Sequence, residues 1–578
     1  MRRDLAALDS NHFDVIVIGA GIFGACAAWD ATLRGLKVAL IDRGDFSGAT
    51  SANSFKMIHG GIRYIQHGDL YRIRQSALAR RTFIRVAPHL CYPLPIVVPT
   101  YGYGMKSKYA IRIAMSVYDM VAWDRNRGIL DPIRQIPRGA CLSRSAVIDQ
   151  YPGLDHEDLT GAAVFSDGQM YNPPRLTLAF IRSASEAGAI VANYVEAKSF
   201  IRRGDQICGV EARDVLDEDA ITIQGRVVLN ATGPYAEELL QRGLGRSLSP
   251  RTSWSRDSYF VVDRRLVAGS STLALPAKTN DPDSVLSRGP RHLFLSPWHD
   301  QTLVGVWHKV YEGDPDAYGL GDEELELFIG EINSVYRGLN LSLGEVSFWN
   351  AGLIPFGEND PSAINLKFAH RSRIVDHQSD QGIDGLITLI GVRYTTGPNE
   401  AVKVVDLVFR KLGRKAPASK LYKTPVHGGR IDDFDLLLRR ALSEASSLIS
   451  KEVVRSLVHN HGNEYGRILE LVRARPELGQ TIGASNVLAA EAVYAATEEM
   501  AQKLEDVVLR RTDLGTTRFP GQASIRLCAS VLATELGWDQ SRANREVEQT
   551  VDRFPVSIRG QSDNSLETDE DQRGLVDR

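Results

Sequence analysis

A glycine-rich turn near the N-terminus constrains the fold of this 578-residue chain more than any other feature of its sequence. The turn, Gly19-Ala20-Gly21-Ile22-Phe23-Gly24, follows a β-branched apolar run over 13–18 and precedes an alanine-rich stretch that stops at Gly35. A second apolar run over 37–41 then ends at Asp42. This order predicts a βαβ unit of the dinucleotide-binding kind, whereas the glycine pattern on its own would fit any tight turn.

Each glycine of the turn has its own physical task. Gly19 permits the turn, Gly21 lets the backbone approach a pyrophosphate, and Gly24 lets the helix pack on the strand. The N–H groups of the helix would hold the phosphates, and Asp42 would accept hydrogen bonds from the adenosine ribose hydroxyls. A second G-x-G-x-x-G does not occur in the sequence. This favours a flavin that the substrate reduces directly over a nicotinamide.

The composition excludes several classes of function. Hydrophobic residues make up 43% and charged residues 24% of the chain, as in ordinary globular proteins, and the length predicts several domains. The 68 basic and 71 acidic residues leave a formal charge of −3, so we expect no nucleic-acid partner. Five dispersed cysteines without a C-x-x-C pair fit a reducing compartment and exclude a cysteine zinc site. We therefore expect a cytoplasmic protein and assign no metal.

The segment 49–64 makes a resemblance to a known family specific. It contains the string Ile58-His59-Gly60-Gly61-Ile62-Arg63-Tyr64, and the chain from 13 to 554 resembles the FAD-dependent glycerol-3-phosphate dehydrogenase family of the aerobic, quinone-linked type. Further motifs that carry the resemblance are Ala87-Pro88-His89-Leu90, Asn230-Ala231-Thr232-Gly233-Pro234, Ser296-Pro297-Trp298, Gly313-Asp314-Pro315 and Arg510-Arg511-Thr512.

The resemblance implies an α/β fold of three parts. An FAD-binding Rossmann-like domain, with two or three β/α layers, would be assembled from 12–100, 150–250 and 350–412. An antiparallel-sheet substrate domain would span 251–349 with a helical insert at about 101–149, and a helical C-terminal domain would span 424–555. The remaining residues, 556–578, are rich in Ser, Asp and Glu and are expected to be disordered.

The resemblance also implies FAD as the cofactor. In the family the segment after the acidic residue runs beneath the isoalloxazine ring, and an A-T-G motif after a later strand, here 226–230, returns to the cofactor. The cofactor-binding residues expected are Gly19, Gly21, Gly24, Asp42, Ser51, Ser54, Lys56, Gly60, Gly61, Thr232, Gly233, Gly391 and Thr395.

By the same resemblance, the enzyme would oxidise sn-glycerol 3-phosphate to dihydroxyacetone phosphate and pass the electrons to a quinone, with oxygen as the alternative acceptor. Arg63, Arg371 and Arg393 are the candidates for holding the phosphate, because guanidinium offers paired donors and a permanent charge. Tyr64 would assist, and His59 is the candidate base. Arg63 could instead form a surface ion pair, and His59 could be a packed imidazole. His308 is a weaker candidate.

Departures from the family pattern gather around the expected substrate. Gly352-Leu353-Ile354-Pro355 stands where the family usually has G-V-R-P, so Ile354 replaces an arginine. Gly305-Val306-Trp307-His308 stands for G-T-T-D, and 391–398 lacks the final Tyr-Arg of its motif. Two alternatives therefore stay open: an enzyme of the same fold acting on another polyol, polyol phosphate or amine, and a flavoprotein with a mainly binding or assembly role.

Three other segments carry alternatives. The run 69–86 predicts a helix capped by Asp69, with arginines that are solvated or paired. The amphipathic run 105–121 favours core packing over peripheral contact with the inner face of the cell membrane. His459 and His461 have a metal-like spacing, but exposed histidines are the commoner reading. A homodimer is left open.

Overall fold

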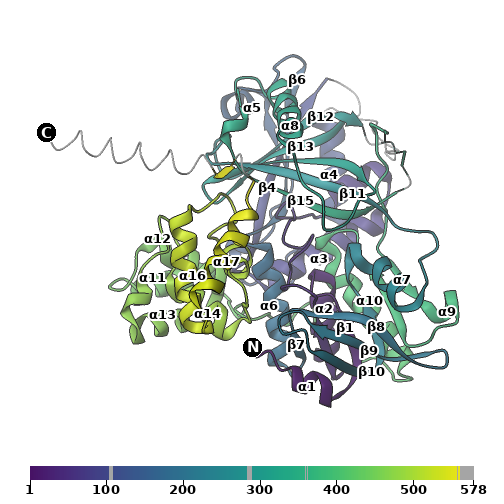
Figure 1. Ribbon diagram of the computed structural model, residues 1–578. Coiled ribbons are helices and arrows are strands. Elements are labelled where there is room, and N and C mark those ends of the chain that lie inside the picture. The colour runs from purple at the N-terminus through teal and green to yellow at the C-terminus, as the bar shows by residue number, and fades with distance from the viewer. Residues whose placement is uncertain are drawn as a thin grey trace.

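The computed structural model describes residues 1–102, 108–280, 282, 290–357, 359–360, 362–555 and 558–559. Two large sheets and a group of C-terminal helices make up the molecule (Figure 1). The mixed α/β fold with a helical C-terminal region confirms the predicted fold class. The predicted disordered tail, 556–578, lies outside the described residues except for 558–559.

The first sheet contains the predicted βαβ unit and has a parallel core. Alternate residues of its central strand face two different hydrophobic clusters: Val15 and Val17 face one, and Ile16 and Ile18 the other. Burial on both faces explains why the strand is apolar throughout. In order across the sheet, the strands are β16 (Arg373–Asp376), β17 (Leu386–Ile390), β10 (Ala220–Asn230), β1 (His12–Ile18), β2 (Val38–Ile41) and β7 (Ile190–Ala192), with β9 (Gln206–Asp214) paired to β10 and β8 (Val195–Arg203) to β9.

Helices cover both faces of this sheet. One cluster is shared by β1 and the helices α2 (Ile22–Leu33), α6 (Pro173–Glu186) and α10 (Gly397–Lys411). The other face packs against α1 (Leu5–Ser10), α7 (Ala236–Leu244) and the β8–β9 hairpin. The short helix α9 (His377–Gln381) follows β16.

The second sheet is antiparallel except where β12 pairs with β4. Its strands are, in order, β15 (Val346–Phe356), β11 (Ser253–Val262), β14 (Gln301–Tyr311), β13 (Pro290–Trp298), β12 (Thr272–Asn280), β4 (Cys91–Tyr101), β6 (Leu159–Met170) and β3 (Met57–Ile58), with β5 (Ala140–Ser143) paired to β6. Helices α8 (Asp322–Val335), α4 (Lys108–Val121) and α5 (Arg144–Gln150) belong to the same part of the chain as these strands.

The second sheet combines strands from several of the predicted stretches, and the domain division itself stays a prediction. Strands β3, β4 and β6 come from 12–100 and 150–250, and β15 crosses the predicted boundary between 349 and 350. The long β4–β6 pairing joins two of these stretches and runs from Cys91 opposite Met170 to Tyr101 opposite Leu159. Strand patterns identify a strand but not the sheet that it joins, so the sequence did not indicate this pairing.

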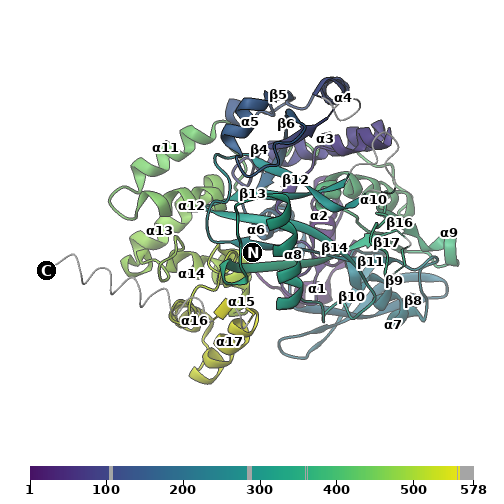
Figure 2. The same cartoon turned by 90° about the horizontal axis from the view of Figure 1, so that it is seen from above.

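The C-terminal helices have hydrophobic cores of their own. Figures 1 and 2 show them grouped on one side of the two sheets. They are α11 (Phe434–Glu444), α12 (Lys451–His461), α13 (Tyr465–Ala474), α14 (Ala489–Glu498), α15 (Leu504–Asp506), α16 (Gln522–Leu536) and α17 (Gln540–Asp552).

Short turns of 3₁₀ helix lie at 62–67, 132–134, 233–235, 343–345, 394–396, 462–464 and 476–479, and a π-helical turn at 507–511.

The predicted helix over 69–86 is confirmed as α3 (Leu70–Val86), and Asp69 caps it by accepting a hydrogen bond from the N–H of Arg72 at 2.8 Å. Most of its arginines are paired or exposed as predicted. Arg80 is different, because its side chain is fully buried and its Nη1 lies 3.6 Å from Oδ1 of Asp167. Arg80 is thus paired inside the protein rather than at its surface.

Over 112–121, where its side chains are described, helix α4 buries one face. Met115 and Tyr118 are buried, whereas Ile113 and Met120 are 67% and 69% exposed. Among the side chains that the structure describes, the predicted core packing of this run therefore holds for Met115 and Tyr118 but not for Ile113 and Met120, and 105–107 lie outside the described part of the chain. Within that described part, no helix combines the length and the apolarity that crossing a membrane requires.

Candidate functional site

A cavity of about 1020 Å³ is lined by residues of both sheets. Its volume is at the upper end of the range of small-molecule and cofactor pockets. The glycine turn after β1 and the loops after β2, β10 and β17 border the cavity, so it lies at the carboxyl ends of the parallel strands. This is the edge at which nucleotides bind in open α/β sheets.

The predicted glycine turn forms one wall of the cavity. Gly19 has a φ of +98°, and a Cβ atom there would lie 2.7 Å from the carbonyl oxygen of Ala231. A Cβ atom on Gly24 would lie 1.9 Å from the carbonyl oxygen of Gly19, so Gly24 serves helix packing and does not itself line the cavity. Gly21 caps α2 and lines the cavity, so the N-terminal end of this helix is available to a phosphate.

Asp42 connects the end of β2 to the same turn. Its carboxylate accepts hydrogen bonds from the N–H groups of Ala20 at 2.7 Å and Gly44 at 3.0 Å. Burial raises the pKa of Asp42 to about 6. Asp42 lines the cavity, where its oxygens could also accept hydrogen bonds from ribose hydroxyls.

The segment 49–64 borders the cavity with only some of the predicted residues. Ser51, Ser54 and Gly61 line it, and the hydroxyl of Ser51 accepts a hydrogen bond from the N–H of Ile22 at 3.0 Å. Among the other predicted cofactor residues, Thr232, Gly233, Gly391 and Thr395 also line the cavity.

The structure does not place Lys56 or Gly60 on the cavity wall. Lys56 is buried behind it, where its Nζ donates a hydrogen bond to the hydroxyl of Tyr259 at 2.7 Å and lies 4.3 Å from the ring of Trp298. Burial lowers the pKa of Lys56 to about 7. A Cβ atom on Gly60 would lie 2.3 Å from Nη1 of Arg80, so the absence of a side chain at Gly60 lets Arg80 pack closely against it.

His59 lies in the cavity wall beside a buried carboxylate. Its Nδ1 is 3.1 Å from Oδ2 of Asp167, and its backbone N–H donates to the hydroxyl of Thr395 at 3.1 Å. The side chain of Asp167 is 5% exposed and that of His59 is 48% exposed. The other Asp167 oxygen accepts a hydrogen bond from the N–H of Gly60 at 2.7 Å. This arrangement can hold an imidazole in one tautomer, as a general base requires.

Two of the three predicted arginines line the cavity. Arg63 and Arg393 do so together with Tyr64, and the guanidinium carbon of Arg393 lies 4.9 Å from the centroid of the Tyr64 ring. Arg371 does not line the cavity, and its guanidinium carbon lies 5.5 Å from the centroid of the Tyr71 ring.

Sequence reasoning missed Arg291, which lines the cavity although it is 5% exposed. The guanidinium carbons of Arg291 and Arg63 lie 4.1 and 5.7 Å from the centroid of one ring, that of Phe368. The same ring contacts Phe356 at 4.6 Å between centroids, and Phe356 follows Ile354 by two residues on β15. Two guanidinium groups thus lie against one ring in the cavity that Ile354 also lines.

His308, the weaker candidate, lines the same end of the cavity. Its Nδ1 lies 2.8 Å from Oδ1 of Asp257, close enough for an ion pair when the imidazole is protonated but not aligned for a hydrogen bond. Asp257 lines the cavity too, so this wall carries an acidic group as well as cations.

His461 is buried and His459 is half-buried, so the prediction that they are exposed is wrong. The ring of His459 stacks on that of Tyr171 with 4.4 Å between centroids, and Nε2 of His461 lies 3.1 Å from Oε2 of Glu491. Among the described residues, no three His, Cys, Asp or Glu side chains are grouped as a metal site would need.

Comparisons with known proteins agree with this geometry. Residues 14–385 match the family model of FAD dependent oxidoreductases, and 422–543 match that of the C-terminal domain of alpha-glycerophosphate oxidase. The glycerol-3-phosphate dehydrogenase of Synechocystis sp. is 29% identical over 560 residues, which are 95% of this chain and 97% of the relative. The mitochondrial glycerol-3-phosphate dehydrogenase of Bos taurus is 28% identical over 564 residues, 94% of this chain and 73% of the relative.

A solved structure shares the fold over most of the chain. It is the glycerol-3-phosphate dehydrogenase from Bacillus halodurans in complex with FAD, which superposes with a TM-score of 0.73 at 22% identity. The match covers 94% of this chain and 95% of that structure.

Proposed function

The chain belongs to the FAD dependent oxidoreductase family, and from this premise we propose that it oxidises sn-glycerol 3-phosphate to dihydroxyacetone phosphate and passes the electrons to a quinone. FAD is its cofactor, and its class is that of glycerol-3-phosphate dehydrogenase-like oxidoreductases. One observation carries the substrate proposal: the base candidate His59 and the guanidinium groups of Arg63, Arg291 and Arg393 line a single cavity.

The residues of the first sheet fit the cofactor. The N-terminal end of α2 would hold the pyrophosphate, Asp42 the ribose, and Ser51, Thr232 and Gly391 would border the remainder. Bound FAD would accept a hydride from the carbon that carries the substrate hydroxyl.

The hydroxyl proton would leave to His59. Asp167 lies at Nδ1 of the imidazole, so the tautomer with a proton on Nδ1 leaves the lone pair of Nε2 as the acceptor. Asp167 would also stabilise the imidazolium once the proton has arrived, because opposite charges at this distance attract inside a protein.

The phosphate would be held by arginines. Arg63, Arg291 and Arg393 bring three permanent charges to the cavity, and guanidinium matches the geometry of phosphate oxygens. With Ile354 in place of an arginine, Arg291 is the residue best placed to supply the missing charge, because it shares the Phe368 ring with Arg63.

The proposed acceptor is a quinone at the membrane surface. The sequence has one nucleotide fingerprint, so NAD(P) has no second site of this kind. Exposed apolar side chains on and after α4 support peripheral contact with the inner face of the cell membrane: Ile113, Met120, Trp123, Leu130 and Ile133.

A second candidate is an enzyme of the same fold that oxidises an uncharged polyol or an amine. Ile354 and the carboxylate of Asp257 in the cavity wall favour it, because an acidic wall opposes a phosphate.

Anaerobic titration of the holoenzyme distinguishes these candidates. We expect glycerol 3-phosphate to bleach the flavin absorbance, and a soluble quinone analogue, but not NAD(P), to restore it. Bleaching by glycerol or an amine, with none by glycerol 3-phosphate, would replace the first proposal with the second. Substrate-linked NAD(P)H formation as fast as quinone reduction would contradict the proposed acceptor.

A further inference from the structure

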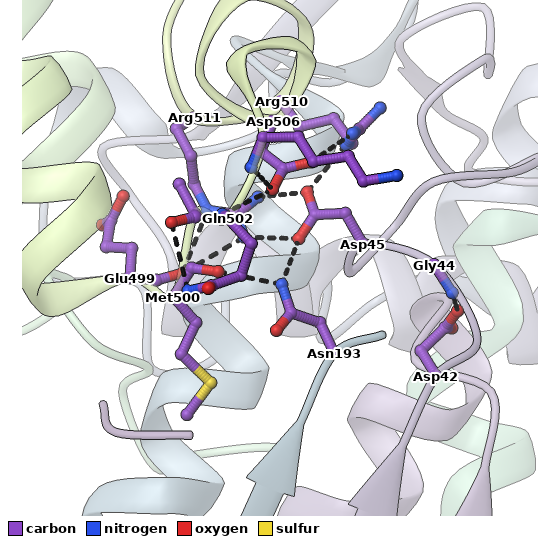
Figure 3. A network of polar contacts seen from close by, with 12 residues as sticks. Asp42, Gly44, Asp45, Asn193, Glu499, Met500, Gln502, Asp506, Arg510 and Arg511 are labelled. Carbon is purple, nitrogen blue, oxygen red and sulfur yellow. Dashed lines mark hydrogen bonds and ion pairs between the residues drawn. The ribbon is translucent and has the colours of Figure 1, made fainter. Parts of the chain in front are cut away.

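Asp45 lies in the loop 42–45 after β2 and connects this loop to the C-terminal helical part of the chain. It lies three residues after Asp42, and the residue as a whole is 3% exposed. It accepts hydrogen bonds from Nε of Arg510 and from Nη1 and Nη2 of Arg511, each at 2.7 Å, and from the side-chain amide of Asn193 at 3.0 Å (Figure 3). The two bonds from Arg511 reach different oxygens of Asp45, so this contact is bidentate.

Both arginines also donate hydrogen bonds within the C-terminal part of the chain. Nε and Nη2 of Arg511 donate to the carbonyl oxygen of Glu499 at 3.2 and 3.1 Å. Nη2 of Arg510 donates to Oδ1 of Asp506 at 2.6 Å (Figure 3). Arg511 ends the π-helical turn at 507–511, and its side chain is 1% exposed. The C-terminal part of the chain thus presents a pair of guanidinium groups to Asp45.

The same loop also borders the cavity. Gly44, next to Asp45, donates its N–H to Asp42 at 3.0 Å, and Asp42 and Gly44 line the cavity. Asp45 and Arg510 line the cavity as well, together with Glu505. A movement of Asp45 would therefore be transmitted to the carboxylate that we expect to hold the ribose.

We propose that Arg511 is a positioning residue for FAD: it acts through Asp45 to hold the 42–45 loop in the cofactor-binding conformation, so that docking of the C-terminal helices and FAD binding strengthen each other. Arg511 does not line the cavity, so its effect on the cofactor is indirect. Because linkage is reciprocal, the factor by which docking tightens FAD binding equals the factor by which FAD tightens docking.

Electrostatics explain why the loss of Arg511 would disturb the position of Asp45. Burial opposes ionisation of Asp45, but the charges of Arg511 and Arg510 outweigh it and lower the pKa of Asp45 to about 2. The carboxylate is thus charged in the interior, and loss of one guanidinium leaves a buried charge short of partners. The loop would then have to shift to recover hydrogen bonds.

The test compares three variants of the full-length protein. Arg511→Met removes the guanidinium, Arg511→Lys keeps the charge without the bidentate contact, and Arg475→Met is the control. Arg475 pairs with Glu535 within the C-terminal helices, at 2.5 Å, and does not line the cavity. The Kd for FAD is measured by reconstitution of the apoprotein, and the unfolding temperature is measured with and without FAD.

We expect Arg511→Met to raise the Kd for FAD about ten-fold, within the range of roughly 5- to 150-fold that is typical of coupling between two sites. It should also shrink the increase in unfolding temperature that FAD produces, because that increase reports binding to the folded state. Arg511→Lys should lie between wild type and Arg511→Met. Arg475→Met should lower the unfolding temperatures of the apo and holo forms equally and leave the Kd unchanged.

Limited proteolysis supplies the reciprocal measurement. FAD should slow proteolytic cleavage within the C-terminal helices of the wild type. In the Arg511 variants FAD should no longer give this protection. If Arg511→Met does not fold, Arg511→Lys and Asp45→Asn are compared instead. The proposal would be overturned if the folded Arg511 variants had the same Kd for FAD, the same stabilisation by FAD and the same protease protection by FAD as the wild type.

Discussion

His59 and Asp167 are neighbours although 108 residues separate them, and Nδ1 of the imidazole lies 3.1 Å from Oδ2 of the carboxylate. The pairing of β3 with β6 produces this contact, because it places Ile58 opposite Gly168 and so makes the next residues neighbours. The carboxylate is buried while the imidazole borders the cavity. A buried acid that orients an accessible imidazole is the arrangement from which general bases act.

Asp167→Asn should slow substrate-dependent flavin reduction by about 10²-fold, and His59→Ala by about 10²- to 10⁴-fold, the range of a lost general base. Asparagine keeps the shape of Asp167 but does not stabilise an imidazolium. Stopped-flow absorbance under anaerobic conditions measures the rate. His156→Ala, at an exposed histidine, is the control. Wild-type rates in both variants at full FAD content would exclude His59 as the base.

Gly21→Val should produce an apoprotein that folds but does not retain FAD. A Cβ atom at Gly21 would lie 3.0 Å from Oγ of Ser51, and the added methyl groups would cover the N-terminal end of α2 where the pyrophosphate is expected. The backbone of Gly21, with φ of −71°, accommodates a side chain, so the fold should survive. The ratio of flavin absorbance to protein absorbance after purification checks the loss.

Gly24→Ala is the matched comparison for that variant. Its Cβ atom would lie 1.9 Å from the carbonyl oxygen of Gly19, a backbone contact that cannot relax easily. We expect Gly24→Ala to lower the free energy of unfolding of the apoprotein, by about 1–3 kcal/mol as overpacking does. Equal unfolding midpoints in urea for Gly24→Ala and wild type would contradict this assignment of packing to Gly24.

The parts of the site that sequence reasoning predicted are local in the chain. The turn from Gly19 to Asp42 is one βαβ unit, and its spacing alone indicates where the nucleotide binds. Asp167 and Arg291 were missed because strand pairing and loop packing, not spacing, bring them to the cavity.

Two residues of the segment 49–64 that we predicted to bind the cofactor, Lys56 and Gly60, do not line the cavity. Lys56 has a φ of +59° and is buried beside Tyr259. Neighbours in the sequence thus point to different sides of one segment. Backbone conformation at single residues is decided by tertiary packing, which a motif does not report.

Lys56→Met should flatten the pH dependence of stability of the apoprotein. The folded pKa of Lys56 is lowered by burial to about 7, against 10.5 in the unfolded chain. Between these values the unfolded chain binds a proton that the folded protein does not, so stability rises with pH and falls as the pH is lowered towards 7. One such proton contributes a slope of up to about 1.4 kcal/mol per pH unit.

Urea unfolding at several pH values from 7 to 9 measures that slope for Lys56→Met and wild type. Lys198→Met is the control, because Lys198 lies at the surface with its side chain 38% exposed. The two slopes should differ for Lys56→Met and agree for Lys198→Met. A Lys56→Met slope as steep as that of the wild type would show that Lys56 is charged in the folded protein.

Arg291→Ala should raise the KM for glycerol 3-phosphate more than it lowers kcat. Arg291 shares the Phe368 ring with Arg63 in the cavity that Ile354 also lines, and a lost charge-assisted bond to phosphate is worth about 1.5–3 kcal/mol, or roughly ten- to 150-fold in binding. Steady-state kinetics with a quinone analogue measure both constants. Arg264→Ala, an exposed arginine paired with Glu345, should change neither.

Ile354→Arg tests the same site from the other side. If phosphate is the bound group, the new guanidinium should raise kcat/KM for glycerol 3-phosphate, and in Arg291→Ala it should recover part of the lost affinity, because either residue can then supply the charge. If an uncharged polyol or amine is the substrate instead, Ile354→Arg should damage that activity by burying an unpaired charge. The proposed phosphate site would have to be abandoned if Ile354→Arg, Arg63→Ala and Arg291→Ala all left turnover and affinity unchanged.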